Sequence, residues 1–232
     1  MLRYVLRPDQ DAFGHLLKDF AAGRPVVEVV ERDDGCVFTG DPSYYLAPFR
    51  EWWPQERRAM RYVRGCVLDL GCGAGRVGVH LQSRGFDVVG IDVSPLAVEL
   101  ARERGASDAR LGTLDTAIKT GELFGTILLL GNNLGLLAGE QQGRRLLRRL
   151  ARVATAEGRL LAGSYDPYEG ASDLARRYQQ RKSRARQNGR RRTSPRLLPQ
   201  LRHPLVRRAL RLTRRAHTNH CRKRLGDERV HR

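Results

Sequence analysis

The residues best suited to carry chemistry surround a glycine turn. An apolar run at residues 66–70 leads directly into Gly71, Gly73 and Gly75, and a second apolar run ends at Asp92. Glycines let the backbone pass close to a ligand, and an acid at the end of the next strand can accept hydrogen bonds from ribose hydroxyls. This order of elements predicts a site for a nucleoside cofactor.

Two cofactor classes are compatible with the glycine spacing. Residues 73–78 satisfy the G-x-G-x-x-G pattern of NAD(P)-binding oxidoreductases, and residues 71–75 satisfy a shorter pattern, G-x-G-x-G. Asp69 favours the shorter one, because a turn that opens at Gly71 places this carboxylate at the strand's exit, where it can meet a ligand's ammonium group. A turn that opens at Gly73 would bury the carboxylate unpaired, which is costly. S-adenosylmethionine has such an ammonium group and no phosphates.

Two segments in register, residues 67–75 and 88–94, closely resemble the class I S-adenosylmethionine-dependent methyltransferases. The resemblance covers residues 51–166. The positions that it assigns to the cofactor S-adenosyl-L-methionine are Asp69, Gly71, Gly73, Gly75, Asp92, Val93, Thr113, Leu114 and Asn132. In this family Asp69 and Gly71 would hold the methionyl part of the cofactor.

The other assigned positions would contact the nucleoside. The resemblance implies that Asp92 binds the ribose diol, that Val93 flanks the adenine, and that backbone at Thr113 or Leu114 contacts the adenine amino group. This chain departs from the family at residues 124–125, which are Phe-Gly where Phe-Asp is usual.

The acceptor side of the site is less defined by the sequence. The candidate substrate contacts are Tyr44, Tyr45, Asn133 and Asp166. Asn132 and Asn133 fit a loop-capping role equally well. Methyl transfer from a sulfonium depends mainly on alignment, proximity and exclusion of water, so no catalytic base is assigned. Tyr165 and Asp166 would be the candidates for one, and His80 is expected to pack inside its helix.

The residues around these positions alternate buried strands with helices, which is typical of a parallel sheet covered on both faces. We expect an α/β fold with a doubly wound, mainly parallel sheet of the Rossmann-like methyltransferase type. The predicted strands are residues 66–70, 86–91, 109–111, 126–130 and 159–164. The predicted helices are residues 55–63, 76–84, 95–104 and 141–154. No later strand can be recognised, so the sheet is expected to lack its last strands.

The chain divides into three parts. Residues 1–53 contain a predicted helix, a hairpin and an aromatic segment (residues 44–53), which is either a lid over the site or a patch that seals the hairpin. Residues 54–173 form the predicted methyltransferase core. Residues 174–232 form an Arg-rich tail.

The excess of basic over acidic residues lies in that tail. Residues 1–175 hold 22 basic and 23 acidic residues, whereas residues 176–232 hold 21 and 2. Such a tail could attract phosphate backbones, which would indicate an RNA or DNA methyltransferase, or it could be disordered. A third hypothesis is a frameshift between residues 178 and 195, which would leave a truncated and inactive methyltransferase. The neutral core and the aromatic segment favour a small organic acceptor, with non-specific nucleic-acid binding through the tail.

Composition excludes several other classes. The longest apolar run, residues 127–130, is too short to span a membrane, and the N-terminus lacks the apolar stretch of a secretory signal. The four cysteines show no paired spacing, which indicates a reduced, cytoplasmic protein. His217, His220 and Cys221 are too weak a pattern to predict a metal site.

Overall fold

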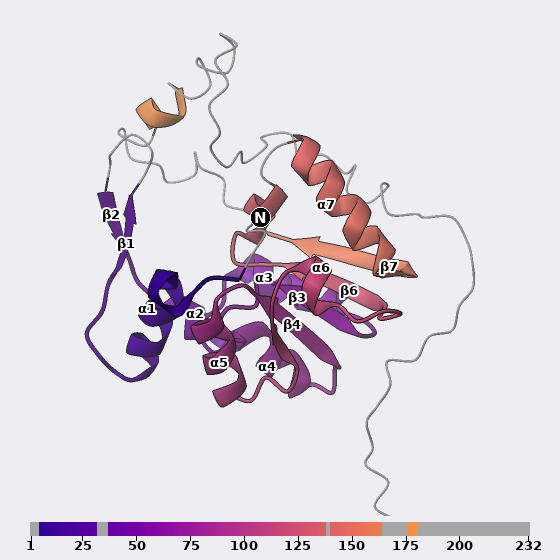
Figure 1. The fold of residues 1–232 in the computed structure, drawn as a ribbon, viewed down its shortest axis with the longest axis horizontal. Coiled ribbons are helices and arrows are strands. Elements are labelled where there is room, and N and C mark those ends of the chain that lie inside the picture. The colour runs from indigo at the N-terminus through magenta and orange to yellow at the C-terminus, as the bar shows by residue number, and fades with distance from the viewer. Residues whose placement is uncertain (1–4, 32–36, 138–139, 164–175, 181–232) are drawn as a thin grey trace, which may run out of the picture.

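The computed structural model describes residues 5–31, 37–137, 140–163 and 176–180. Its centre is a five-stranded parallel sheet in the order β5-β4-β3-β6-β7 (Figure 1). The strands are β3 (Val67–Leu70), β4 (Val88–Asp92), β5 (Ala109–Leu111), β6 (Phe124–Leu129) and β7 (Ala154–Ala162). The helices of this core are α3 (Pro54–Ala59), η3 (Met60–Tyr62), α4 (Arg76–Gln82), α5 (Pro95–Glu103), α6 (Leu114–Ala117), η4 (Asn133–Leu137) and α7 (Glu140–Arg152). The predicted doubly wound α/β fold is confirmed.

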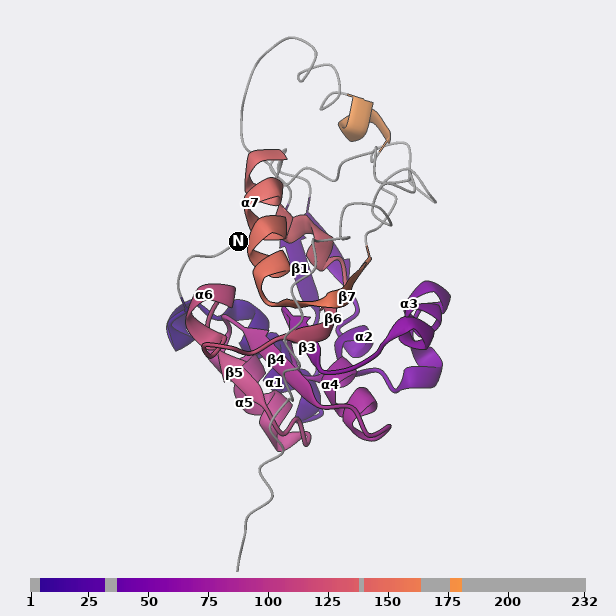
Figure 2. The same cartoon turned by 90° about the vertical axis from the view of Figure 1, so that its right-hand side faces the viewer.

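Both faces of the sheet are covered, because successive strand residues point to opposite sides. On one face Leu68 and Ile127 belong to a core cluster that includes Leu146 of α7. On the other face Val67 and Leu128 pack in a cluster with residues of η3 and α4. Figure 2 shows α6 and α7 on one side of the strands and α3 on the other. Among the described residues, no helix has the length and apolar character needed to cross a membrane.

The N-terminal part packs on the core through its first helix. It contains η1 (Pro8–Gln10), α1 (Ala12–Ala21), the antiparallel hairpin of β1 (Glu28–Glu31) and β2 (Val37–Gly40), α2 (Ser43–Leu46) and η2 (Phe49–Glu51). The predicted hairpin is confirmed, and it extends away from the main sheet (Figure 1). The fully buried Asp11 carboxylate caps α1 by accepting from the Gly14 amide, and it also accepts from Ser94 Oγ and the Leu96 amide. This one side chain therefore fixes the start of α1 against the start of α5.

Several boundaries differ from the prediction. The last described strand begins at Ala154, not at residue 159, and the helix before it ends at Arg152. Phe124 pairs with Ala154 while Thr126 pairs with Arg159, so β7 bulges between these positions. Gly158 lies in that bulge, where a Cβ would stand 2.9 Å from the Thr155 carbonyl oxygen. In the sequence Gly158 stands directly before the predicted strand, but in the structure it lies within β7 and permits the bulge.

The short helix α6 was not predicted. Thr113 caps it in a capping box with Thr116, at a place where the sequence shows only a four-residue segment with no apolar periodicity. The structure also explains the Phe-Gly departure at the start of β6. A Cβ on Gly125 would stand 2.7 Å from the Arg64 carbonyl oxygen, so an aspartate does not fit there.

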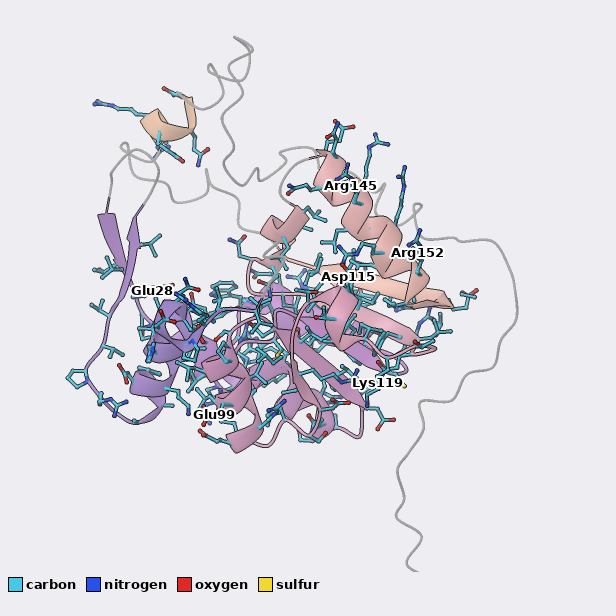
Figure 3. All side chains as sticks on the ribbon, viewed as in Figure 1. Glu28, Glu99, Asp115, Lys119, Arg145 and Arg152 are labelled. Atoms are coloured by element: carbon cyan, nitrogen blue, oxygen red, sulfur yellow. The ribbon has the colours of Figure 1, made fainter. Side chains whose placement is uncertain are left out.

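The outer face of α7 is strongly basic. Arg145 and Arg152 lie on this helix and are exposed to solvent (Figure 3). Leu146 and Leu150 on the opposite face are buried against the sheet. Apart from residues 176–180, which are helical, the tail lies outside the described residues, and so do the expectations about missing strands, disorder and a frameshift.

Candidate functional site

A cavity of about 240 Å³ lies at the carboxyl ends of β3, β4 and β6. This is where an open α/β sheet is expected to bind a ligand. Its lining combines charged, aromatic and glycine residues from the core and the N-terminal part. The lining residues are Phe13, Tyr44, Tyr45, Asp69, Gly71, Cys72, Gly73, Ala74, Arg76, Val77, Asp92, Leu130, Gly131 and Asn133.

The cavity brings together most of the residues that the sequence singled out, but not all of them. Tyr44, Tyr45, Asp69, Gly71, Gly73, Asp92 and Asn133 line it. Gly75, Val93, Thr113, Leu114 and Asn132 do not line it. Asp166 and Tyr165 lie outside the described residues.

The glycine loop is held in the left-handed backbone region, with φ values of 81° at Gly71, 53° at Gly73 and 75° at Gly75. The three glycines serve different purposes. A Cβ on Gly71 would stand 2.4 Å from Asn133 Nδ2, and one on Gly75 would stand 3.0 Å from the Cβ of Ala101. A Cβ on Gly73 would have no closer neighbour than Phe13, at 3.9 Å. Gly73 is therefore the glycine that keeps space open for a ligand.

Asp92 is oriented by the backbone of two loops. Its Oδ2 accepts a hydrogen bond from the Gly73 amide at 2.9 Å, and its Oδ1 accepts from the Ser94 amide at 3.0 Å. Burial raises the pKa of Asp92, and these backbone hydrogen bonds oppose the shift. The carboxylate is thus fixed at the floor of the cavity with lone pairs left for a ligand.

Asp69 is the most unusual carboxylate of the cavity. Its side chain is buried, and Oδ2 has no hydrogen-bond partner among the described residues. Burial raises the pKa of Asp69 to about 7, although the Arg76 guanidinium opposes this shift. A buried and incompletely satisfied carboxylate is costly, so this oxygen is suited to a cationic donor that enters the cavity.

The two asparagines after β6 have different environments. Asn133 Nδ2 donates to the carbonyl oxygens of Leu70 and Gly71, at 3.1 and 2.9 Å, so it supports the glycine loop as a capping residue. Asn132 is exposed and has a φ of 70°. The loop-capping alternative therefore describes Asn133, which also lines the cavity.

The residues assigned to the adenine do not line the cavity. Thr113 and Leu114 are buried at the start of α6. The Val93 carbonyl oxygen accepts from the Leu6 amide, which ties the N-terminal part to the core. The cofactor roles of these residues stay predictions.

Sequence reasoning missed a buried charged cluster on the wall of the cavity, formed by Arg76, Glu56 and Tyr44. Arg76 Nη2 donates to Glu56 Oε2 at 2.8 Å and to the Tyr44 hydroxyl at 2.5 Å. That hydroxyl donates to Glu56 Oε2 at 2.6 Å, and Glu56 Oε1 accepts from the Gly131 amide at 3.0 Å. No spacing pattern marks this cluster in the sequence, because its members are 12 to 32 positions apart.

The aromatic segment contributes two of the cavity's walls. Tyr44 stacks on Trp53 with ring centroids 4.0 Å apart, and Tyr45 meets Phe13 edge to face at 5.0 Å. As expected, His80 packs rather than facing the cavity, because its ring stacks on Phe49 at 4.0 Å. Within the part of the chain that the structure describes, no group of acids, histidines and cysteines could hold a metal ion.

Comparison with known proteins gives consistent matches. Residues 67–158 match the family described as a methyltransferase domain. A 2-heptyl-1-hydroxyquinolin-4(1H)-one methyltransferase of Mycobacteroides abscessus is 39% identical over 28% of this chain and 32% of its own length. A magnesium-protoporphyrin O-methyltransferase of Rhodobacter capsulatus is 49% identical over 17% of this chain and 18% of its own. The matches thus span less than half the length of these relatives.

A solved structure covers more of the chain. The SAM-dependent methyltransferase from Bacteroides fragilis, in complex with S-adenosyl-L-homocysteine, superposes with a TM-score of 0.62 at 26% identity. The match covers 74% of this chain and 72% of that one. The family match at residues 67–158 and the structural match therefore both indicate a methyltransferase fold.

Proposed function

The chain contains a class I S-adenosylmethionine-dependent methyltransferase domain, and on this premise we propose that it transfers a methyl group from S-adenosylmethionine to a small organic acceptor. The observation that carries the proposal is Asp69. Its unpartnered buried oxygen lies beside a glycine loop that leaves space at Gly73. This arrangement suits a ligand in which an ammonium group is followed by a sulfonium and a nucleoside.

The residues present fit this cofactor. Asp69 would accept from the methionyl ammonium group, Asp92 would accept from the ribose hydroxyls, and the backbone at Gly73 would pass close to the ligand. When bound, S-adenosylmethionine supplies a methyl group on a sulfonium that is already a good leaving group. The protein's task is then to bind, to align the acceptor and to exclude water.

The aromatic segment would perform the last two tasks. Tyr44 and Tyr45 line the cavity together with the glycine loop, so they would cover a planar acceptor. Tyr45 is the ring that would stack on it, because Trp53 and Arg76 already lie against the ring of Tyr44. A small acceptor is supported by the two relatives, which are named as methyltransferases of a hydroxyquinolinone and of magnesium protoporphyrin. We also propose a cytoplasmic location, which the free thiol of Cys72 supports.

The cofactor is tested by calorimetric titration of the full chain with S-adenosylhomocysteine and, separately, with NADH. We expect one S-adenosylhomocysteine to bind per chain and NADH not to bind. Binding of NADH in its place would overturn the proposal in favour of an oxidoreductase.

The acceptor class is tested with S-adenosylmethionine that carries a labelled methyl group. Planar hydroxylated heterocycles and total RNA are offered side by side, at low and at high salt. We expect label in the small molecules at both salt concentrations. Label in RNA alone, persisting at high salt where attraction through the basic tail is weak, would contradict a small acceptor.

A further inference from the structure

Arg76 lines the cavity and has one guanidinium nitrogen without a hydrogen-bond partner among the described residues. Its side chain is 8% exposed, and its guanidinium lies over the ring of Tyr44 at 4.2 Å and over that of Trp52 at 4.5 Å. Nη2 is engaged by Tyr44 and Glu56, but the buried Nη1 has no hydrogen-bond partner among the described residues. Because aromatic rings cover the guanidinium, a new ligand must approach along its edge.

The chemistry of Nη1 determines which kind of ligand can bind to it. An unsatisfied charged N–H is costly when buried, so a ligand that accepts from Nη1 removes a penalty as well as adding a bond. A carboxylate is suited to this place, because an ionised acceptor forms a short, strong hydrogen bond with a guanidinium N–H. Glu56 already neutralises Arg76, so the new acceptor would form a charge-assisted bond rather than replace the ion pair.

A second unpartnered atom of opposite character lines the same cavity. Asp69 Oδ2 lacks a donor, just as Arg76 Nη1 lacks an acceptor, and the two side chains interact electrostatically. An α-amino-acid group presents an ammonium and a carboxylate on one carbon. It would satisfy both atoms at once.

We propose that Arg76 is the carboxylate-binding residue of this cavity, with Nη1 donating to a carboxylate of a bound ligand. The inference rests on the proposed function. The carboxylate has two sources there: the methionyl end of the cofactor, which the pairing with Asp69 favours, or an acidic acceptor. No sequence pattern or comparison assigns this role to Arg76.

The first arm of the test compares S-adenosylhomocysteine with S-adenosyl-3-thiopropylamine, which is the same molecule without its carboxylate. We expect the wild-type chain to bind the former tenfold to a hundredfold more tightly, the range of a charge-assisted hydrogen bond. Arg76→Lys keeps a charge beside Glu56 but loses the planar edge, and it should reduce this preference to less than about threefold.

The matched control is Arg102→Lys. Arg102 also uses its guanidinium inside the fold, donating to the Ala109 carbonyl oxygen from Nε and Nη2, but it does not line the cavity. This variant should keep the wild-type preference. If Arg76→Lys does not fold, Arg76→Gln takes its place, and equal binding of the two ligands by the wild-type chain still counts against this arm.

The second arm tests the acceptor as the source. Thermal shifts are measured for 2-naphthoate against 2-naphthamide, with the chain saturated with S-adenosylhomocysteine. If Arg76 serves the acceptor, the wild-type chain prefers the acid and Arg76→Lys loses that preference, while the two adenosyl ligands bind alike. No Arg76-dependent preference in either arm overturns the proposal.

The two proposals fail differently. If the wild-type chain binds neither adenosyl compound, the proposed function is wrong, and the second arm on the free protein still tests Arg76. If it binds both adenosyl compounds equally and shows no preference for the acid, the methyltransferase proposal stands and only the role of Arg76 is lost.

Discussion

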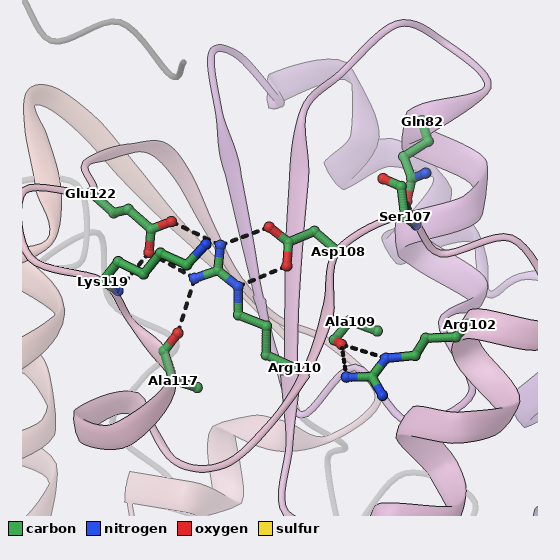
Figure 4. A network of polar contacts seen from close by, with 9 residues as sticks. All are labelled: Gln82, Arg102, Ser107, Asp108, Ala109, Arg110, Ala117, Lys119 and Glu122. Atoms are coloured by element: carbon green, nitrogen blue, oxygen red, sulfur yellow. Dashed lines mark hydrogen bonds and ion pairs between the residues drawn. The ribbon is translucent and has the colours of Figure 1, made fainter. Parts of the chain in front are cut away.

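Two arginines of this molecule sit in acidic surroundings, but only one of them has all its donors used. Arg110 on β5 donates from Nε and Nη2 to Asp108, from Nη1 and Nη2 to Glu122, and from Nη1 to the Ala117 carbonyl oxygen (Figure 4). These five bonds use all five N–H groups of a guanidinium. Arg76 is buried more deeply, yet its Nη1 has no partner among the described residues.

This difference distinguishes a cluster that stabilises the fold from a cluster that can bind a ligand. The Arg110 cluster joins β5 to the loop before β6, and it does not line the cavity. A completed network of this kind gives a fixed geometry and has no capacity for a ligand. Arg76 and Tyr44 line the cavity, and the cluster that they form with Glu56 lacks one acceptor, so a ligand can complete it.

Substitution of Arg76 should lower the free energy of unfolding more than substitution of Arg110, and this is the largest effect that we expect. Arg76→Met leaves the buried Glu56 without its cation, which should lower the free energy of unfolding by about 3 to 5 kcal/mol. Arg110→Met leaves Asp108 and Glu122 partly in water, and it should cost about 1 kcal/mol. Denaturation in urea measures both variants, and equal losses would contradict the distinction.

An aspartate that lines the cavity and an aspartate of the Arg110 cluster should differ in their effect on cofactor affinity. Asp92→Ala removes the acceptor proposed for the ribose and releases the Gly73 amide, so affinity for S-adenosylhomocysteine should fall about a hundredfold. Asp108→Ala removes an acid of similar charge from the Arg110 cluster, and it should leave affinity within about twofold. Calorimetry on both variants checks this, and similar losses would show that net charge, not position, controls binding.

The affinity for S-adenosylhomocysteine should depend on pH. An ammonium group needs ionised Asp69, whose pKa is raised to about 7 by burial, so affinity should fall about tenfold between about pH 8 and about pH 6. The Arg110 hydrogen bond lowers the pKa of Glu122, which therefore stays ionised throughout this range.

Two variants assign the titrating group. Asp69→Asn should bind weakly at every pH with no slope, because it has no proton to lose. Glu122→Gln should keep the wild-type slope. A slope that persists in Asp69→Asn would mean that another group governs the pH dependence.

These contrasts show what sequence reasoning could reach. The glycine loop and Asp69 and Asp92 are local features at the ends of apolar runs, so their types and spacing predicted both the sheet and its ligand-binding edge. Arg76 was visible only as the first residue of a helix, because its partners Glu56 and Tyr44 come from segments brought to it by the fold. The bulge at Gly158 was hidden for the same reason, since it depends on pairing with β6.

The aromatic segment allows the finest test, because two neighbouring tyrosines line the cavity with different partners. The Tyr44 hydroxyl accepts from Arg76 and donates to Glu56, whereas the Tyr45 hydroxyl donates to Glu28 of β1, at 3.0 Å. Tyr44→Phe should therefore lower the free energy of unfolding by about 1 kcal/mol, the cost of leaving a buried donor without its acceptor. Tyr45→Phe should change it by less than about 0.5 kcal/mol, because Glu28 is only half-buried and water can replace the hydroxyl. Both variants keep the aromatic ring, so ring contacts are preserved in each, and urea denaturation isolates the contribution of the hydroxyl. Equal effects would mean that the Arg76 cluster does not depend on Tyr44, and that its unused edge is set by the Glu56 ion pair alone.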